Sequence, residues 1–447
     1  MRSLFRVSLV VLLAVGATWT AAAQDVPIRI NTVGTTDSRI PIAVPAVVAE
    51  RNAVNYSANF ASVVSRDLDF SGLFAIVGAA KYPPSFRGLE ADVTKLNFSD
   101  WRSTPAEYLV HTTLSLDVNL LLAECRLYDV PEAQQVFGKR LRPRADSAHN
   151  LSQAQWARLF AHQFADETVR FLTGEAGVAS SEIVFSGGIQ RVKEIYIADY
   201  DAGKVTQVTH HGSISIKPKF SPDGTRIAYL SYKDRYPWLY IYNRSTGLST
   251  ILSKRSGLNH APAWSSDGSR IALVLSKDAN TEIYMKNADG SGERRLTYNT
   301  DSDTSPAFSP DGGQLVFVSD RAGRPQIYVM SSDGGAARRM SFQGGSSYDP
   351  AWSPDGNYIA YIVEKEGRGL ELWMMNADGS GARDLTASVG SNESPSWSPD
   401  SRHIAFSSSR SGVSQLYTVT LETGVVRQIP NLRHLKAEGP SWGPRRN

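Results

Sequence analysis

The chain has 447 residues, of which 41% are apolar and 20% are charged, and its formal net charge is +3. This length predicts two domains, and the composition is typical of a soluble globular protein. Lysine and arginine form no basic stripe, which makes nucleic acid a poor candidate partner. The single cysteine, Cys125, excludes an internal disulfide and cysteine-based metal sites. It lies in the apolar run LLLAECRLYDV, which predicts a small buried residue.

Residues 1–23 have the pattern of a secretory signal peptide. Arg2 and Arg6 precede an apolar run over residues 7–17, and three consecutive alanines end at Ala23. The run is too short to cross a bilayer, and no later stretch is long enough. We expect an exported mature chain that begins at Gln24 and has a net charge of +1, because cleavage removes the two arginines.

Residues 24–173 lack a repeat and are predicted to form an N-terminal α/β domain. Residues 24–35 fit a mobile arm or an edge strand, and the sequence does not decide between them. Residues 39–48 are strand-like, and a helix ending near Gly72 is followed by a further strand. The segments 108–116 and 120–130 are expected to pair as strands.

A second helix is predicted at the end of this domain. Its apolar residues recur on one helical face, which indicates a buried stripe. The stripe consists of Trp156, Leu159, Phe160, Phe164, Phe171 and Leu172. The small residues of 174–180 then predict a linker.

Residues 181–447 carry an internal repeat with a step of 44 or 45 residues. The first marker is an aromatic residue before each turn: Phe220, Trp264, Phe308, Trp352, Trp397 and Trp442. A second marker keeps the same step: Tyr196, Tyr240, Tyr284, Tyr328, Trp373 and Tyr417. Each copy contains four short strand patterns separated by Gly- and Asp-containing turns, which is typical of a β-propeller blade.

The two ends of the repeat are incomplete in complementary ways. EIVFSGG (residues 182–188) matches a second strand without a preceding SPDG turn, and PSWGP (residues 440–444) supplies a first strand with nothing after it. Joined, they complete a sixth blade and remove the open sheet edge. The predicted fold is therefore an α/β N-terminal domain plus an all-β six-bladed β-propeller closed by pairing of its N- and C-terminal strands.

The repeated turns and the variable loops have different expected roles. A catalytic acid is needed once, so aspartates that recur in five SPDG-type turns are assigned to turn chemistry. These are Asp223, Asp267, Asp311, Asp355 and Asp400. The recurring aromatic residues are assigned to packing between blades. The variable loops from one blade to the next gather on the other face, where a rigid scaffold can display a binding site.

Motifs for catalysis are missing from the sequence. It contains no G-x-S-x-G elbow, phosphate-binding loop or H-E-x-x-H. Four histidines in neighbouring variable loops would bind a transition metal if they converged, and are otherwise solvated or partner-facing: His210, His211, His260 and His434. Rim carboxylates suit Ca²⁺ in the channel, although no cofactor is required: Asp301, Asp303, Asp349, Glu393 and Glu438.

A combination of features closely resembles the TolB family, the periplasmic propellers of the Tol–Pal envelope system. The features are a signal peptide, an α/β domain containing RDLDFSGLF, and the repeat P-x-[FW]-S-P-D-G-x-x-[IL]-[AV]-[YF] with SDRAGRPQIY. The resemblance covers essentially the whole mature chain. It implies a non-enzymatic periplasmic protein that supports outer-membrane integrity and constriction during cell division.

The resemblance also implies partners and contact positions. The propeller mouth would bind the lipoprotein Pal, and colicins would compete for it during bacteriocin import. The implied Pal-binding residues are Asn259, His260, Ala261, Asp303, Thr304, Tyr348, Asp349, Asn392, Glu393 and Glu438. The implied TolA-binding arm comprises Gln24, Asp25, Val26, Pro27, Ile28, Arg29 and Ile30. Leu258 stands where the family pattern has a histidine, so the contacts in that loop stay open.

Two other functions fit less of the pattern. One is a periplasmic propeller hydrolase or lyase that uses the histidines and acids of the rim. The other is a sensor of small ligands in the channel. We expect no enzyme activity, and association with the membrane only through partner proteins.

Overall fold

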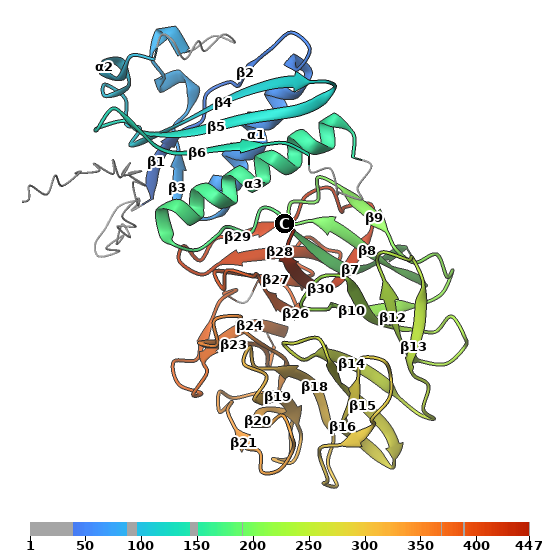
Figure 1. Ribbon diagram of the computed structural model, residues 1–447. Coiled ribbons are helices and arrows are strands. Elements are labelled where there is room, and N and C mark those ends of the chain that lie inside the picture. Colours follow the sequence, from blue (N-terminus) through green and yellow to red (C-terminus); the bar gives the residue numbers. More distant parts are fainter. Residues whose placement is uncertain are drawn as a thin grey trace, which may run out of the picture.

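The structure, a computed structural model, describes residues 39–86, 96–143, 151–189, 191–367, 369–387 and 389–446. It has an α/β domain followed by a β-propeller (Figure 1). The signal peptide expected over residues 1–23 and the arm expected over residues 24–35 lie outside the described residues. Within the described ranges, no helix has the length and apolar character that a bilayer crossing requires.

The N-terminal domain is built on one mixed sheet. Its strands are β1 (Ile40–Ala43), β2 (Val48–Ala49), β3 (Phe74–Ile76), β4 (Tyr108–Asp117), β5 (Leu120–Asp129) and β6 (Gln134–Leu141). Its helices are α1 (Val54–Phe70), η1 (Ala79–Lys81), η2 (Pro84–Phe86), α2 (Phe98–Trp101) and α3 (Gln153–Thr173). The strand order is β3–β1–β4–β5–β6, with β2 also paired to β4. β1 is parallel to β3 and β4, whereas β4, β5 and β6 are antiparallel.

Helices α1 and α3 share the core of this domain, and α3 lies between the sheet and the propeller (Figure 1). A capping box of Ser152 and Gln155 starts α3, and Gly174, with a φ of 85°, ends it. The predicted stripe is wrong at Phe171, which is 46% exposed and stacks on Phe137 at a centroid distance of 5.4 Å. Cys125 is buried as predicted, and burial raises the pKa of its thiol to about 12.

The propeller has six four-stranded blades, as predicted. Blade one consists of β10 (Ser215–Phe220), β11 (Arg226–Ser231), β12 (Trp238–Asn243) and β13 (Ser249–Ser253). Blade two consists of β14 (Asn259–Trp264), β15 (Arg270–Asp278), β16 (Asn280–Asn287) and β17 (Arg294–Arg295). Blade three consists of β18 (Asp303–Phe308), β19 (Gln314–Ser319), β20 (Gln326–Ser331) and β21 (Arg338–Arg339). Blade four consists of β22 (Ser347–Trp352), β23 (Tyr358–Lys365), β24 (Gly369–Asn376) and β25 (Arg383–Asp384). Blade five consists of β26 (Asn392–Trp397), β27 (His403–Ser408), β28 (Gln415–Thr420) and β29 (Val426–Gln428).

Blade six joins the two ends of the propeller sequence, which confirms the predicted closure. It contains β30 (Lys436–Arg445), β7 (Ser181–Ile189), β8 (Val192–Asp199) and β9 (Val205–Gln207), in that order. Trp442 of β30 pairs with Ile183 of β7, and its indole Nε1 donates to Ser181 Oγ at 2.7 Å. Among the described residues, every first strand is therefore paired with a second strand, including β30 at the end of the propeller sequence.

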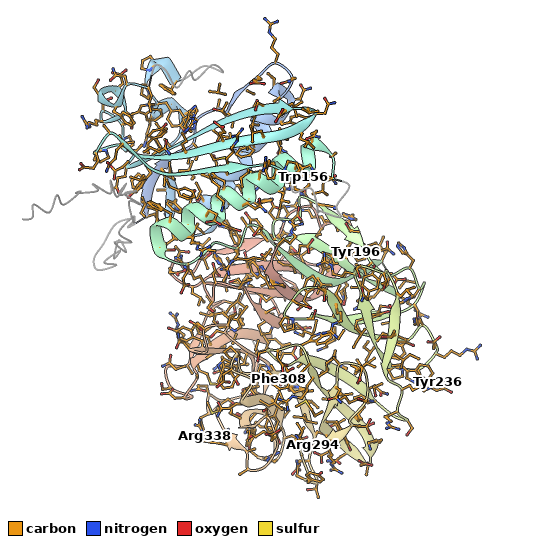
Figure 2. The ribbon with its side chains drawn as sticks, viewed as in Figure 1. Trp156, Tyr196, Tyr236, Arg294, Phe308 and Arg338 are labelled. Atoms are coloured by element: carbon orange, nitrogen blue, oxygen red, sulfur yellow. The ribbon has the colours of Figure 1, made fainter. Side chains whose placement is uncertain are left out.

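Neighbouring blades are joined by side chains that repeat around the ring. Trp264 Nε1 donates to the Lys219 carbonyl of the previous blade at 3.1 Å, and Trp397 Nε1 does the same to Ala351 at 2.9 Å. On the outer strands, Arg294 and Arg338 each donate to a carbonyl in the next blade (Figure 2). The recurring aromatic residues thus pack between blades, as expected.

The SPDG-type turns lie on the face opposite the variable loops, and each is closed by its own side chains. In blade three, Ser309 Oγ donates to Asp311 Oδ1 at 2.5 Å, and Gly312 takes a φ of 72°. Hydrogen bonds from Ser309 and from the backbone of Gly313 lower the pKa of Asp311. These aspartates hold turns, as the repeat indicated.

The N-terminal domain rests on this turn face, at blades five and six. Asp67 of α1 accepts hydrogen bonds from Tyr200 Oη at 2.5 Å and from His162 Nδ1 at 2.6 Å. Phe70 stacks on His403 of blade five, with ring centroids 4.7 Å apart. The variable-loop face is left open on the far side.

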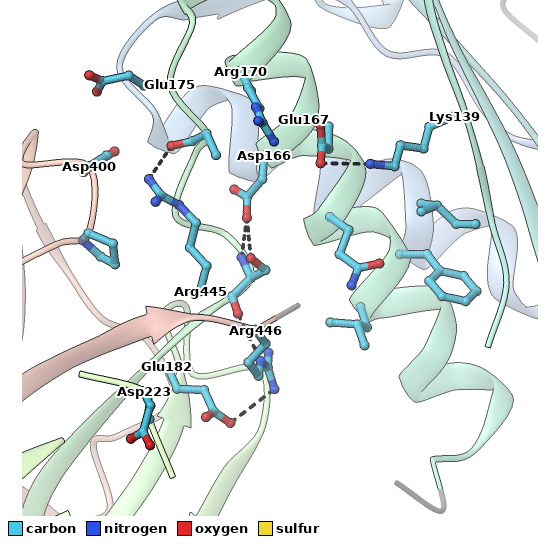
Figure 3. Close-up of a pocket in the computed structure, with 18 of the residues that line it drawn as sticks. Lys139, Asp166, Glu167, Arg170, Glu175, Glu182, Asp223, Asp400, Arg445 and Arg446 are labelled. Atoms are coloured by element: carbon cyan, nitrogen blue, oxygen red, sulfur yellow. Dashed lines mark hydrogen bonds and ion pairs between the residues drawn. The ribbon is translucent and has the colours of Figure 1, made fainter. Parts of the chain in front are cut away.

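Residues 174–180 between the domains are held from two directions (Figure 3). Asp166 of α3 accepts hydrogen bonds from the backbone N–H groups of Ala179 at 2.7 Å and Ser180 at 2.8 Å. Arg445, at the end of β30, donates to the carbonyls of Ala176 at 2.6 Å and Gly177 at 2.5 Å. The segment is therefore fixed by both domains.

We predict that closure of the ring depends on Trp442. Trp442→Ala should lower the free energy of unfolding by about 3–5 kcal/mol, because it removes a buried indole and its bond to Ser181 from the closing sheet. Calorimetric unfolding measures the loss. Trp397→Ala, at an equally buried indole of a blade that needs no closure, is the matched control and should cost less. Equal losses would contradict a special contribution of the closing blade.

Candidate functional site

The first strand of every blade carries the same backbone irregularity at the channel. In each strand a left-handed residue precedes a proline, with φ between 45° and 60°. We call these six residues the inner ring: Lys217, Ala261, Ser305, Asp349, Ser394 and Gly439. The pairing with the second strand skips two positions there, which marks a β-bulge. A left-handed non-glycine residue is strained, so the surrounding ring must hold this conformation.

The residue before each inner-ring position forms a second set, the outer ring. Its members lie on the first strands, are partly or fully exposed, and pair with the second strands in one register. The outer ring consists of Ile216, His260, Thr304, Tyr348, Glu393 and Glu438. The two rings together define the mouth of the propeller. The six blades have the same backbone conformation at these positions, whereas each blade has a different pair of side chains.

The residue immediately before each outer-ring residue is buried, because successive side chains along a strand point to opposite sides. Asn259, Asp303 and Asn392 are each 0% exposed. Asn259 Oδ1 accepts from Ser253 Oγ at 2.7 Å, Asp303 accepts two bonds from Arg321, and Asn392 Oδ1 accepts from Arg410 at 3.1 Å. These three side chains hold loops in place. We therefore correct the expected contact set by removing them from it.

The inner ring combines opposite charges. Lys217 Nζ lies 3.7 Å from Asp349 Oδ1, and the hydroxyls of Ser305 and Ser394 donate to Asp349 at 3.3 Å each. Burial acts to raise the pKa of Asp349, but Lys217 and Lys219 lower it below its ordinary value. Asp349 is therefore an ionised, already bonded carboxylate.

The outer ring contains one neutral imidazole and one paired acid. Burial and the nearby Lys217 lower the pKa of His260 to about 4, so this histidine is uncharged at neutral pH. Glu438 is ion-paired with Lys193 and with Lys436, whose Nζ lies 2.7 Å from it. Glu393 is exposed.

A channel of about 460 Å³ runs down the axis from the inner ring. At its other end it is lined by prolines of the SPDG-type turns, and two of them, Pro354 and Pro399, also line a cavity of about 1810 Å³ between the domains. Figure 3 shows this second cavity, with Arg445, Arg446 and Glu182 at its propeller side. The channel thus leads from the mouth towards the domain interface.

The channel does not fit the Ca²⁺ ion that the rim acids suggested. Among the described residues that line it, Asp349 is the one carboxylate and stands against Lys217 and Lys219. Ca²⁺ takes six to eight oxygen ligands, whereas this lining offers a single carboxylate. Two ammonium groups oppose a divalent cation.

The four loop histidines do not form a metal site within the described part of the chain. His210 and His434 are exposed, and His211 lies against Ser215 Oγ at 3.2 Å and stacks near Tyr229. The one converging group there of three possible metal ligands is His162, Asp199 and Asp201, at the domain interface. Arg158 already pairs with both of those aspartates.

Comparison with known proteins identifies the family. The family model described as TolB beta propeller domain matches residues 169–446, and the one described as TolB amino-terminal domain matches residues 28–136. The chain belongs to the TolB family. The propeller that carries the mouth is therefore a TolB family propeller.

Two relatives named Tol-Pal system protein TolB show the extent of the similarity. The protein from Ruegeria sp. (strain TM1040) is 35% identical over 235 residues, covering 51% of this chain and 50% of the relative. The one from Methylobacillus flagellatus is 35% identical over 241 residues, covering 52% and 51%. The chain thus spans about half the length of the curated relatives it matches.

A solved structure extends the likeness to both domains. The crystal structure of TolB from Acinetobacter baumannii superposes with a TM-score of 0.79 at 24% identity, covering 91% of this chain and 97% of that chain. The likeness supports the two-domain fold of the TolB family.

The channel residues that the sequence analysis did not name include Lys217, Lys219, Ser305 and Ser394. A signal for three of them is present, because proline inside a strand is found at bulges, and each of the three precedes one. Reading Pro218, Pro306 and Pro395 as bulge markers would have placed their neighbours at the channel. Lys219 follows Pro218, and its own signal is a departure from the repeat, because the other five blades have Ala or Ser at this position.

The acid sensitivity of the mouth should depend on His260. The folded-state pKa of about 4 lies below the ordinary value of 6.5, so the folded state favours the neutral ring. Its contribution to stability is present above pH 6.5 and is lost as the pH falls towards 4. His260→Gln should therefore flatten the fall in melting temperature over this range and leave the value at pH 8 unchanged.

His111 provides a matched control for this prediction. Burial and Arg126 lower its pKa to about 4 as well, but it lies in the N-terminal domain. His111→Gln should flatten the acid response of the N-terminal domain alone, measured by calorimetry. An unchanged acid response of the propeller in His260→Gln would refute the assignment.

Proposed function

We propose that the chain is a non-enzymatic periplasmic component of the Tol–Pal system. Its propeller mouth binds the lipoprotein Pal, and residues 24–30 bind TolA. In this role it supports outer-membrane integrity and constriction during cell division, and colicins compete for the mouth. The relatives' name and the family membership support the system. The observation that carries the binding site is the mouth, a double ring in which every blade has a different pair of side chains on the same backbone.

The mouth-side loops have the composition of a protein-binding surface. Four aromatic side chains there are well exposed: Tyr232 at 37%, Tyr236 at 63%, Tyr298 at 73% and Phe342 at 66%. Figure 2 places Tyr236 at the rim of the propeller. Aromatic residues are enriched in protein interfaces because they bury a large area at low entropic cost. The seven exposed or channel-lining residues of the expected set lie on the first strands of blades two to six, which mouth-side loops lead into.

The hydrolase or lyase alternative would use the histidine and acids of the rim, and three such groups at the mouth are already bonded or neutral. Asp349 is bonded to two serines, Glu438 is paired with two lysines, and His260 is neutral. General acid–base chemistry needs a group that titrates near the working pH. A binding function uses these groups as they are.

Variants of the mouth test the Pal site. Thr304→Ile adds bulk in the outer ring, and Ala261→Asn adds a polar side chain at a position with a φ of 49°, which asparagine tolerates. A β-branched residue at Ala261 would confound the test by straining the backbone. Each variant should raise the Kd for Pal at least about tenfold, measured by calorimetry, because it disrupts a packed contact.

The control places a matched change on the opposite face. Thr246→Ile lies in an exposed turn on the SPDG side and should leave the Kd for Pal unchanged. All three variants should melt close to the unaltered protein. Full-strength Pal binding by both mouth variants would refute the site.

The arm and the mouth are proposed to be coupled through β30. This strand carries Glu438 and Gly439 at the mouth and Arg445 at the interdomain segment. Seven residue steps separate the two ends, roughly 23 Å along a strand. A ligand that shifts one end acts on the contacts at the other, and such coupling is reciprocal.

Deleting residues 24–35 tests both parts of this proposal. The deletion should abolish binding to TolA and change the affinity for Pal, measured by calorimetry with each purified partner. Retained TolA binding would contradict the arm as its site. An unchanged affinity for Pal would contradict the coupling while leaving the mouth as the Pal site.

A further inference from the structure

The channel of this chain contains a lysine where the other blades have a small residue. Lys219 follows Pro218 in blade one. The equivalent residues of the other five blades are Ala263, Ala307, Ala351, Ser396 and Ser441. The small residues leave space at this level of the channel, and Lys219 is the one long side chain that extends there from the described first strands.

The Lys219 ammonium has no bonded counter-charge in the described structure. No hydrogen bond or ion pair to a described residue holds it, whereas Lys217 lies beside Asp349. Asp349 is already bonded to Ser305 and Ser394. The channel therefore holds one more positive than negative group.

The surroundings make this positive charge costly. Aromatic and proline side chains form most of the channel wall, and Phe308 and Trp352 are partly exposed within it. Burial lowers the pKa of Lys219 to about 8, although Asp349 acts in the opposite direction. The side chain is still mostly protonated at neutral pH. Lys219 is partly buried, and a partly buried charge without a partner favours binding of an opposite charge.

We propose that the axial channel binds a carboxylate group, held by Lys219 together with Lys217 and entering from the mouth. A cavity of about 460 Å³ accommodates a carboxylate on a short aliphatic stem. The poorly hydrated walls strengthen the charge–charge attraction over its value in water. Two sources offer this group: a free small carboxylate, or an Asp or Glu side chain of the protein that docks at the mouth. The second source rests on the proposed function.

The direct test follows Lys219 in the full mature chain by NMR with ¹³C-labelled lysine. Its resonance is assigned by its loss in Lys219→Arg. Sodium acetate should raise the titration midpoint of Lys219 by about one pH unit relative to sodium chloride at the same ionic strength, as a nearby carboxylate does. A midpoint that is the same in both salts would refute binding of free carboxylate.

Lys219→Met removes the charge and keeps the length of the side chain. It should raise the melting temperature in chloride, because an uncompensated charge is lost, and it should no longer respond to acetate. Lys81→Met, at an exposed lysine of η1, is the matched control and should change neither property. A structural role for Lys219 predicts the opposite sign, a lower melting temperature. Stabilisation of the unaltered protein by Ca²⁺ instead of acetate would overturn the proposal.

Binding of purified Pal ectodomain separates the two sources. A Kd for Pal raised about tenfold in Lys219→Met but not in Lys81→Met assigns the carboxylate to the partner, since a charge-assisted bond is lost. An unchanged Kd together with the acetate response assigns it to a free ligand. If Lys219→Met affects neither Pal nor acetate binding while the unaltered chain binds Pal, the anion site is refuted and the mouth stands. If the unaltered chain does not bind Pal, the proposed function fails and the acetate result still decides the anion site.

Discussion

The pairing of β30 with β7 is the interaction on which the rest of the structure depends. It joins Trp442 to Ile183, residues 259 positions apart in the chain, and so turns five complete blades into a closed ring. Without it, the twelve mouth positions would not surround one axis. The same strand ends at Arg445, whose guanidinium holds the segment between the domains. One sheet edge thus sets both the shape of the mouth and the position of the N-terminal domain.

The bulge in every first strand separates the scaffold of the site from its chemistry. Six left-handed residues repeat the same backbone, from Lys217 in blade one to Gly439 in blade six. Because the backbone is fixed by pairing and by the following proline, the side chain at each position is free to differ. The result in this chain is a ring with Lys217 opposed to Asp349 and small residues elsewhere. A binding surface of this kind changes specificity without changing the fold.

The sequence predicted the fold well because the repeat is periodic, and it predicted the site less well because burial there alternates residue by residue. Six blades and their closure follow from markers such as Trp442, which recur at a fixed step. In contrast, Asn259 and His260 are adjacent polar residues in one loop pattern, yet the first is fully buried and the second partly exposed. The register of the strand decides this, and proline-marked bulges set the register. The docking of the domains depends on single side chains and has no period to reveal it.

The position of that docking follows from departures from the repeat. Identical turns could not distinguish one blade from another, so a domain that docks at one place needs a blade that differs. Blade five has Ser401 where the other turns have glycine, and its second strand begins with His403. Ser401 adopts a φ of 57° and its Oγ accepts a bond from Asp355 N at 3.0 Å, while His403 Nε2 donates to the Phe70 carbonyl at 3.1 Å. The N-terminal domain thus contacts blade five directly beside its irregular turn, and the shared geometry of the other turns keeps the remaining turn face uniform.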